Sequence, residues 1–230
     1  MSSTTVSKPR VSRPRSVVRI PGVTRPKFFP GKTAAERDAA RRAGDWGKVL
    51  ACHYVENMAH AFAWYAPEMD DASYWTLLGH AYVDEKHLRR VRWLFDQLLR
   101  SERPGRHNMM SPEDYTVLQQ LPDSIEIYRG YSGKGAAGTS WTLDRRIAVW
   151  FAHRDSRWNG EPIVIRGTVR REDVYAYCSA MGEAEIIVPS ELVQDQVPEV
   201  DHSPRDTVSM PLQQYMQEPF DVTPLLRVAS

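Results

Sequence analysis

The sequence predicts an α+β fold, with a helical first half and a β-rich second half. Up to residue 121 the apolar residues recur at helical spacing, whereas from Ile125 onward short β-rich runs alternate with turns. The 230 residues are enough for one well-buried core, and a hydrophobic content of 42% is normal for a soluble globular protein. We divide the chain into an arm over residues 1–30, a helical segment over 31–121 and a β-rich core over 122–230.

The first 30 residues form a basic, proline-containing arm. They carry seven Lys or Arg residues and no acidic residue, although the whole chain has a net charge of only +1. Five prolines prevent a continuous helix, and little in the arm can be buried, so we expect a disordered tail or an extended strap. Two roles are open: electrostatic contact with nucleic acid or an acidic protein surface, or simple solubilisation.

Helical patterns follow the arm. Thr33 and Glu36 have the spacing of a capping box at the start of the first helix. Pro67 ends the second helix, and either Gly79 or Asp84 could divide the third. The predicted helices cover residues 33–43, 46–66 and 72–100, followed by one that starts at Pro112.

The second half reads as short strands with one helix among them. That helix is predicted over 143–154, after a turn at 138–142, with Thr142 as its cap and His153 at its end. The strands are predicted over 125–131, 162–170, 173–178, 184–188 and 220–227.

Glu183 and Glu185 are the most informative residues of this half. They flank Ala184 directly before the apolar run 186–188. In an extended strand, residues i and i+2 project from the same face, so the sequence places the two carboxylates side by side. Such a pair suits acid–base or cation-stabilising chemistry, and the alternative is an ordinary solvated strand face.

Three short motifs in the second half occur in a suggestive order. Tyr128-Arg129-Gly130 ends a strand, Gly-Thr-Ser-Trp-Thr at 138–142 leads into a helix, and Glu183-Ala184-Glu185 enters a strand. Together, over residues 122–195, they resemble the arginine-serine-glutamate class of mono-ADP-ribosyltransferases, in particular its bacterial and phage branch of effectors and toxins. The resemblance implies a helical N-terminal half packed on a mixed or antiparallel β-sandwich core of the ADP-ribosyltransferase type.

The resemblance also implies residues that bind NAD. Arg129 would hold the dinucleotide through phosphate or ribose oxygens, a role that suits a permanently charged, planar guanidinium. Gly130 would allow close approach of the ligand, and Tyr131 would stack on nicotinamide or adenine. The alternatives are a surface ion pair for Arg129 and an ordinary strand end for Gly130.

Catalytic roles follow from the same resemblance. Ser140 would hydrogen-bond Glu185 and fix its orientation, although the family often has Ser-Thr-Ser where this chain has Thr-Ser-Trp at 139–141. Glu185 would stabilise the positive charge that develops on the ribose as the bond to nicotinamide breaks. Glu183 would orient the acceptor and take its proton. A glutamate at that place accompanies arginine acceptors in the family, so the implied activity is transfer of ADP-ribose to arginine side chains of a target protein, with release of nicotinamide.

Several other classes of protein find no support in the sequence. Cys52 and Cys178 stand alone in apolar contexts, so we expect buried thiols and no metal site. No apolar stretch approaches a membrane span, and we expect a cytoplasmic protein without a membrane partner. Two alternatives to the arginine-specific enzyme are open: a non-catalytic module that binds nucleic acid or protein through the basic arm, and the same chemistry directed at nucleic acid.

Overall fold

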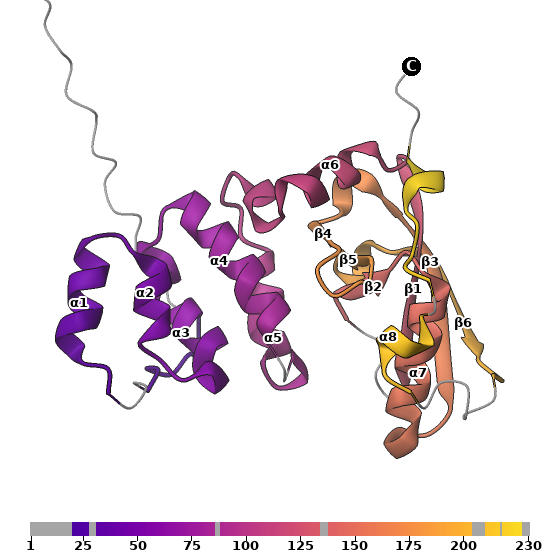
Figure 1. The fold of residues 1–230 in the computed structure, drawn as a ribbon, viewed down its shortest axis with the longest axis horizontal. Coiled ribbons are helices and arrows are strands. Elements are labelled where there is room, and N and C mark those ends of the chain that lie inside the picture. Colours follow the sequence, from indigo (N-terminus) through magenta and orange to yellow (C-terminus); the bar gives the residue numbers. More distant parts are fainter. Residues whose placement is uncertain are drawn as a thin grey trace, which may run out of the picture.

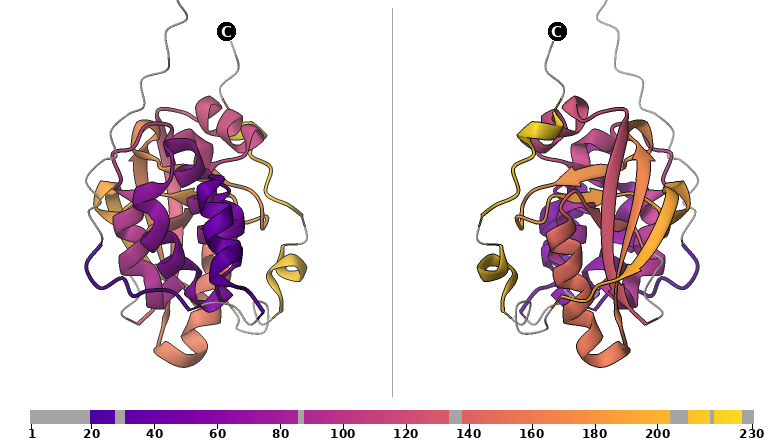
Figure 2. Two further views of the ribbon diagram at one scale, coloured as in Figure 1. Left: turned by 90° about the vertical axis from the view of Figure 1, so that its left-hand side faces the viewer. Right: turned by 90° about the vertical axis from the view of Figure 1, so that its right-hand side faces the viewer.

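The protein has a helical half and a sheet half that lie side by side (Figure 1). The computed structural model describes residues 20–27, 31–85, 88–133, 138–203, 210–216 and 218–226. Most of the basic arm and residues 134–137 therefore lie outside the described residues. Helices α1 to α5 lie on one side of the sheet, as Figure 2 shows from both ends. An α+β fold with an antiparallel sheet is confirmed.

Among the described residues, the helical half contains six α-helices in chain order. The capping box is present, with the Thr33 hydroxyl accepting from the Glu36 amide and the Glu36 carboxylate accepting from the Thr33 amide. Asp84 ends the fourth helix, which agrees with one of the two predicted divisions. The helices are α1 (Ala34–Arg42), α2 (Trp46–Ala51), α3 (Met58–Tyr65), α4 (Asp71–Asp84), α5 (Leu88–Leu99) and α6 (Pro112–Gln120).

The predicted single helix over 46–66 is wrong, because the chain leaves the helix between α2 and α3. This break places the buried His53 ring between two partners, the Lys27 carbonyl at 3.0 Å and the Tyr65 hydroxyl at 3.2 Å. The first of these contacts ties the end of the arm to the helical half. A pattern of apolar spacing does not report such a contact, since it depends on residues far apart in the sequence.

The six strands of the described residues form one sheet in the order β4-β5-β2-β1-β3-β6, with antiparallel pairing throughout. β1 and β3 pair over nine residues each, whereas β1 and β2 share only the pair Tyr128↔Thr142. The sheet is therefore two three-stranded parts held together by one short junction. The strands are β1 (Ser124–Ser132), β2 (Ser140–Thr142), β3 (Pro162–Arg170), β4 (Ala176–Cys178), β5 (Glu185–Ile187) and β6 (Gln194–Val200), with helices α7 (Arg145–Asn159) and α8 (Leu212–Tyr215).

Three corrections to the predicted elements fall in this half. Residues 140–142 form β2 and not a turn, because their ladder partners lie in β5, far along the chain. β6 was not predicted, since all seven of its side chains are exposed and it lacks apolar alternation. Residues 220–227 form no strand among those described: Asp221 accepts from the Thr223 amide at 2.9 Å and begins a short 3₁₀ turn that contains Pro224.

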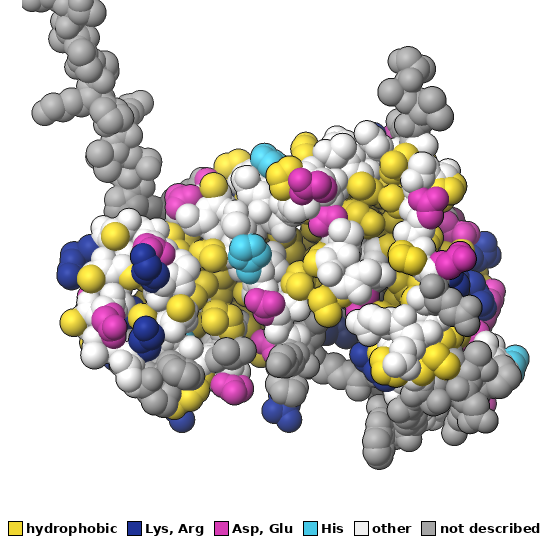
Figure 3. All heavy atoms as spheres, viewed as in Figure 1, with side chains coloured by type: hydrophobic (Ala, Val, Ile, Leu, Met, Phe, Trp, Pro, Cys, Tyr) yellow, Lys and Arg dark blue, Asp and Glu magenta, His cyan; other side chains and the backbone are white. Residues whose placement is uncertain are grey.

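Three apolar clusters form the core of the described residues, and the first of them joins the two halves. The helical core extends to Ala176 of β4 and Ile187 of β5, so these two strands pack against the helices. The second core lies within the sheet half and contains Ile127, Trp141 and Ile186. In the space-filling view, hydrophobic side chains gather along the seam between the halves (Figure 3). None of the described helices is long and apolar enough to cross a membrane.

Close packing of α7 on β1 depends on Gly130. A Cβ built at Gly130 would lie 1.7 Å from the Ala148 carbonyl oxygen, so Gly130→Ala has to push α7 away from the sheet. We expect a loss of about 3 kcal/mol in the free energy of unfolding, measured by urea denaturation. Gly47→Ala in α2 is the control, because its Cβ would meet nothing closer than 3.8 Å, and it should stabilise slightly. Equal effects of the two substitutions would contradict this packing.

Candidate active site

Three neighbouring strands bring Arg129, Ser140 and Glu185 together. They lie on β1, β2 and β5, which are adjacent in the sheet although the residues span 57 positions of the sequence. The register pairs Thr142 with Glu185 and Ser140 with Ile187, so Ser140 and Glu185 share one face of the sheet. All three predicted residues are half-buried.

Glu185 is an acid whose environment opposes its ionisation. Burial raises its pKa to about 7 from an ordinary value of 4.5, and the nearby charge of Glu183 adds to this rise. The hydroxyls of Ser140 and Tyr82 and the charge of Arg129 favour the carboxylate and limit the rise. A carboxyl group poised near neutral pH in a half-buried site is a feature of functional sites more often than of ordinary surfaces.

Arg129 bridges the point where β1 and β2 part. Its guanidinium donates a hydrogen bond to the main-chain carbonyl of Ser140. The guanidinium lies against Gly138, where a Cβ would come within 2.3 Å of Nη2, so a side chain at this position would displace the guanidinium. Gly138 is itself held by Ser190, whose hydroxyl accepts from the Gly138 amide at 2.9 Å.

Glu183 lies outside the strand, which corrects the prediction that it shares a strand face with Glu185. β5 begins at Glu185, and Ala184 has a φ of 42°, a left-handed conformation that is uncommon for a residue with a side chain. The Thr142 hydroxyl donates to the Glu183 carbonyl at 2.6 Å, and the Leu143 amide donates to the Ala184 carbonyl at 3.0 Å. These bonds fix the backbone between the two acids.

The Glu183 carboxyl nevertheless stays near Glu185. Burial raises the pKa of Glu183, and the charge of Arg154 on α7 opposes this rise. The Arg154 guanidinium lies 4.5 Å from the centre of the Phe151 ring and 5.2 Å from that of Trp150. The half-buried acid is therefore accompanied by a cation held on two aromatic rings.

Thr142 is not the helix cap that the sequence predicts. Asp144 is the cap of α7, because its carboxylate accepts from the Arg146 amide at 2.8 Å. The Thr142 hydroxyl instead accepts from the Asp144 amide at 3.1 Å and donates to Glu183. Thr142 thereby joins the start of α7 to the acidic segment.

Two of the predicted cofactor contacts belong to the packing of the protein. At Gly130 the close backbone approach is made by Ala148 of α7, which fills the space that a ligand was expected to take. Tyr131 is buried in the core of the sheet half with Trp141. Trp150 is half-buried, and its indole donates to the Met210 carbonyl at 2.9 Å. Tyr131 and Trp141 thus belong to the core, whereas Trp150 lies at its edge.

Sequence reasoning missed two residues of the site, Tyr82 and Thr139. Tyr82 lies on α4 and is only 2% exposed. Its hydroxyl lies 3.4 Å from the Thr139 hydroxyl. Thr139 directly precedes Ser140 and its carbonyl accepts from the Val188 amide at 2.8 Å. Only the apolar spacing of α4 marked Tyr82, and that signal indicates burial without indicating what its hydroxyl contacts.

His153 lies within α7 and not at its end, which corrects another prediction. It is buried, and its Nε2 lies 2.9 Å from the carboxylate of Asp201, which is also buried. Burial raises the pKa of Asp201, but its hydrogen bonds to His153 and Ser203 outweigh burial and lower it overall. This pair ties α7 to the chain just after β6.

Removing the Asp201 carboxylate should therefore destabilise the fold. Asp201→Ala leaves a buried imidazole N–H without its acceptor, and we expect a loss of about 1–3 kcal/mol at pH 8. Asp201→Asn keeps a carbonyl oxygen for His153 and should cost less. Urea denaturation of both variants tests this, and an equal loss for Ala and Asn would show that the hydrogen bond is not what matters.

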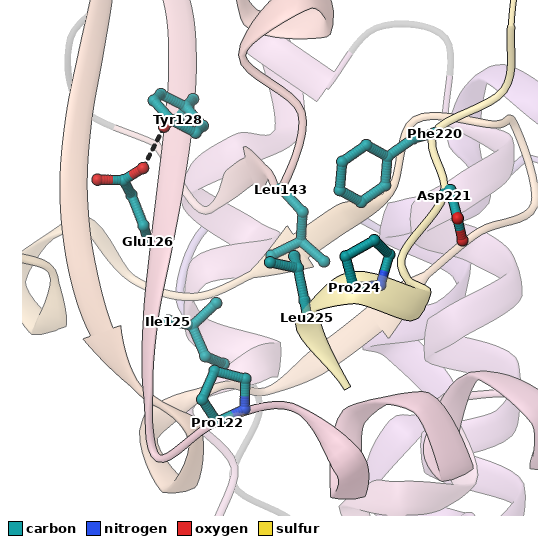
Figure 4. A pocket seen from close by; sticks show the side chains of 9 residues that line it. All are labelled: Pro122, Ile125, Glu126, Tyr128, Leu143, Phe220, Asp221, Pro224 and Leu225. Carbon is teal, nitrogen blue, oxygen red and sulfur yellow. Dashed lines mark hydrogen bonds between the residues drawn. The ribbon is translucent and has the colours of Figure 1, made fainter. Parts of the chain in front are cut away.

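Two pockets lie elsewhere on the molecule. One of about 350 Å³ is mainly apolar and lies between β1 and the C-terminal segment, where Phe220, Pro224 and Leu225 face Ile125 and Leu143 (Figure 4). The other, of about 400 Å³, is polar and lies beside His153 and Asp201. Neither pocket is lined by Arg129, Ser140 or Glu185. The chemical argument for those three residues rests on their mutual geometry.

In the part of the chain that the structure describes, no group of three or more His, Cys, Asp or Glu side chains is arranged to bind a metal ion. Cys52 is buried and Cys178 half-buried, and both are free thiols. Cys178 pairs with Glu185 across β4 and β5, and burial raises the pKa of its thiol.

Comparison of the chain with known protein families, curated proteins and solved structures finds no match.

Proposed function

We propose that the protein is an NAD-dependent ADP-ribosyltransferase that modifies arginine side chains of target proteins and releases nicotinamide. The observation that carries the proposal is the meeting of Arg129, Ser140 and Glu185 on three adjacent strands, with hydroxyl groups facing the Glu185 carboxyl. We further propose that the divided sheet is a core of the ADP-ribosyltransferase type, since it parts where Arg129 reaches across to Ser140.

The residues of the site suit NAD as a substrate. The Arg129 guanidinium has five N–H donors in a planar fork, which allows it to hold Ser140 and a phosphate or ribose oxygen together. The close fit of Gly138 against it limits the positions that the guanidinium can take. Gly130 and Tyr131 are not part of this proposal, because α7 and the sheet core already account for them.

Glu185 supplies the electrostatic part of the chemistry. Bound NAD brings the ADP-ribosyl group and a positively charged nicotinamide. Because a neighbouring cation favours the charged form of an acid, Glu185 should ionise when NAD binds, although its pKa is about 7 without ligand. The carboxylate then stabilises the positive charge that develops on the ribose, while Ser140 holds its orientation.

Glu183 is assigned to the acceptor. A guanidinium is hard to deprotonate, so transfer to it requires a base that acts as the new bond forms. Burial raises the pKa of Glu183, which makes its carboxylate a better base than an exposed one. The target is therefore a protein with an arginine side chain that can reach the carboxyl group of Glu183.

Incubation with NAD labelled in its adenosine part tests the proposal. The protein is mixed with a cell lysate or with an arginine-rich peptide, and label and nicotinamide release are followed together. We expect label on arginine side chains, located by mass spectrometry. Label on nucleic acid would redirect the chemistry to that acceptor, and the absence of both label and nicotinamide release would contradict the proposal.

A further inference from the structure

Tyr82 connects the helical half to the candidate active site. It lies near the end of α4, its ring packs edge-on against Phe95 at 5.4 Å, and it belongs to the same apolar core as Ile187 of β5. Ile187 and Glu185 are two residues apart on β5 and so project from the same face. The side chain of Glu185 therefore points toward the helices at the place where Tyr82 is buried.

The hydroxyl of Tyr82 has a defined set of neighbours. Thr139 Oγ1 lies 3.4 Å away, and the charge of Glu185 acts on the Tyr82 hydroxyl more strongly than that of the other nearby acid, Asp96. Burial and the charge of Glu185 raise the pKa of Tyr82, so the phenol stays protonated. Because Thr139 can donate to the phenol oxygen, the phenol hydrogen is available for Glu185.

We propose that Tyr82 is a positioning residue for Glu185: its hydroxyl donates to the carboxylate in addition to that of Ser140 and so makes the helical half part of the active site. The inference rests on the proposed function for its effect on catalysis. Two donors from different halves would fix the carboxylate more firmly than Ser140 alone. They would also favour the charged form that the chemistry uses.

The effect of Tyr82→Phe follows from the loss of one donor. The pKa of Glu185 should rise by about one pH unit above its value near 7, because a hydrogen bond to a charged group is stronger than one to a neutral group. At NAD concentrations well below KM, NAD turnover at pH 7 should then fall about fivefold, since fewer molecules of the free enzyme carry the carboxylate. At pH 9 turnover should recover, which a general loss of structure would not allow.

Tyr74→Phe is the matched control. Tyr74 also lies on α4 and is buried, but its hydroxyl donates to the Leu98 carbonyl at 2.7 Å, within the helical half. Tyr74→Phe should lower the free energy of unfolding without shifting the pH profile of NAD turnover. Thr139→Val provides a second test that leaves Tyr82 in place, and it should shift the profile in the same direction by a smaller amount.

The experiment measures the ionisation of Glu185 directly and also through its effect on NAD turnover. Side-chain carboxyl ¹³C shifts of glutamate-labelled protein are followed against pH, with the Glu185 signal assigned by its loss in Glu185→Gln. A raised pKa in Tyr82→Phe but not in Tyr74→Phe, with the same displacement of the turnover profile, is the expected result. An unchanged Glu185 titration in folded Tyr82→Phe overturns the inference. If the titration shifts but the wild type shows no NAD turnover, the positioning contact stands and the proposed function fails.

Discussion

Glu185→Gln is expected to abolish transfer of ADP-ribose while making the protein more stable at pH 8. A neutral amide has nearly the shape of the carboxylate and can still accept from Ser140 and Tyr82, but it cannot stabilise positive charge on the ribose. Loss of one electrostatic group of this kind costs a factor of about 10²–10³ in rate. Label transfer and nicotinamide release should therefore both fall by at least that factor.

The sign of the stability change follows from the pKa of Glu185. The folded-state pKa is about 7 and the ordinary value is 4.5, so the folded protein holds a proton that the unfolded chain has already lost between these pH values. Stability consequently declines as pH rises from about 4.5 to 7, and this loss is complete above 7. The glutamine variant has no such loss. For a half-buried group we expect a gain of about 1–2 kcal/mol at pH 8 and almost none at pH 4.

Thermal unfolding at the two pH values measures this effect, with Glu191→Gln as the control. Glu191 is exposed and paired with Arg100, and the hydrogen bond to Arg100 lowers its pKa. Glu191→Gln should therefore leave activity intact and slightly reduce the free energy of unfolding at pH 8, whereas Glu185→Gln should increase it. Retained transfer in Glu185→Gln would remove Glu185 from the mechanism. A pH-independent stability change would show that its carboxyl ionises normally.

Regular elements with their own apolar pattern could be predicted from the sequence. β3 spans residues 162–170 as expected, because its residues alternate between the two faces of a long, regular pairing with β1. β2 and β6 could not be predicted in this way. The three residues of β2 are extended only because β5 lies beside them, and β6 is an exposed edge strand that contains Pro198. Strand formation there is decided by partners and not by local residue preferences.

The candidate site was predictable to the extent that its residues carry their own chemical signal. The residue types and order of Arg129, Ser140 and Glu185 predict a shared site, and the sheet brings them together. The small size of Gly130 suits the approach of a ligand, but α7 uses that space instead. Tyr82 gave no functional signal, because a tyrosine on the apolar face of a helix has the same pattern whether or not its hydroxyl reaches another element.

Glu183→Gln is expected to separate transfer from hydrolysis. The amide keeps the size of the side chain but cannot accept a proton from an arginine guanidinium, so transfer to arginine should fall by about 10²-fold or more. Nicotinamide release to water should change little, because Glu185, Ser140 and Arg129 remain. The backbone should also remain in place, since Thr142 bonds the carbonyl of residue 183 and not its side chain.

Both products are measured in one reaction, nicotinamide by chromatography and ADP-ribosyl arginine by mass spectrometry. Glu185→Gln provides the comparison in which both products are lost. Because the acid at 183 sits before β5, on the far side of the left-handed Ala184, its carboxyl is held separately from that of Glu185. This geometry is what allows the two acids to have different tasks. A Glu183→Gln variant that loses both products to the same degree would contradict that division and leave the arginine acceptor without support.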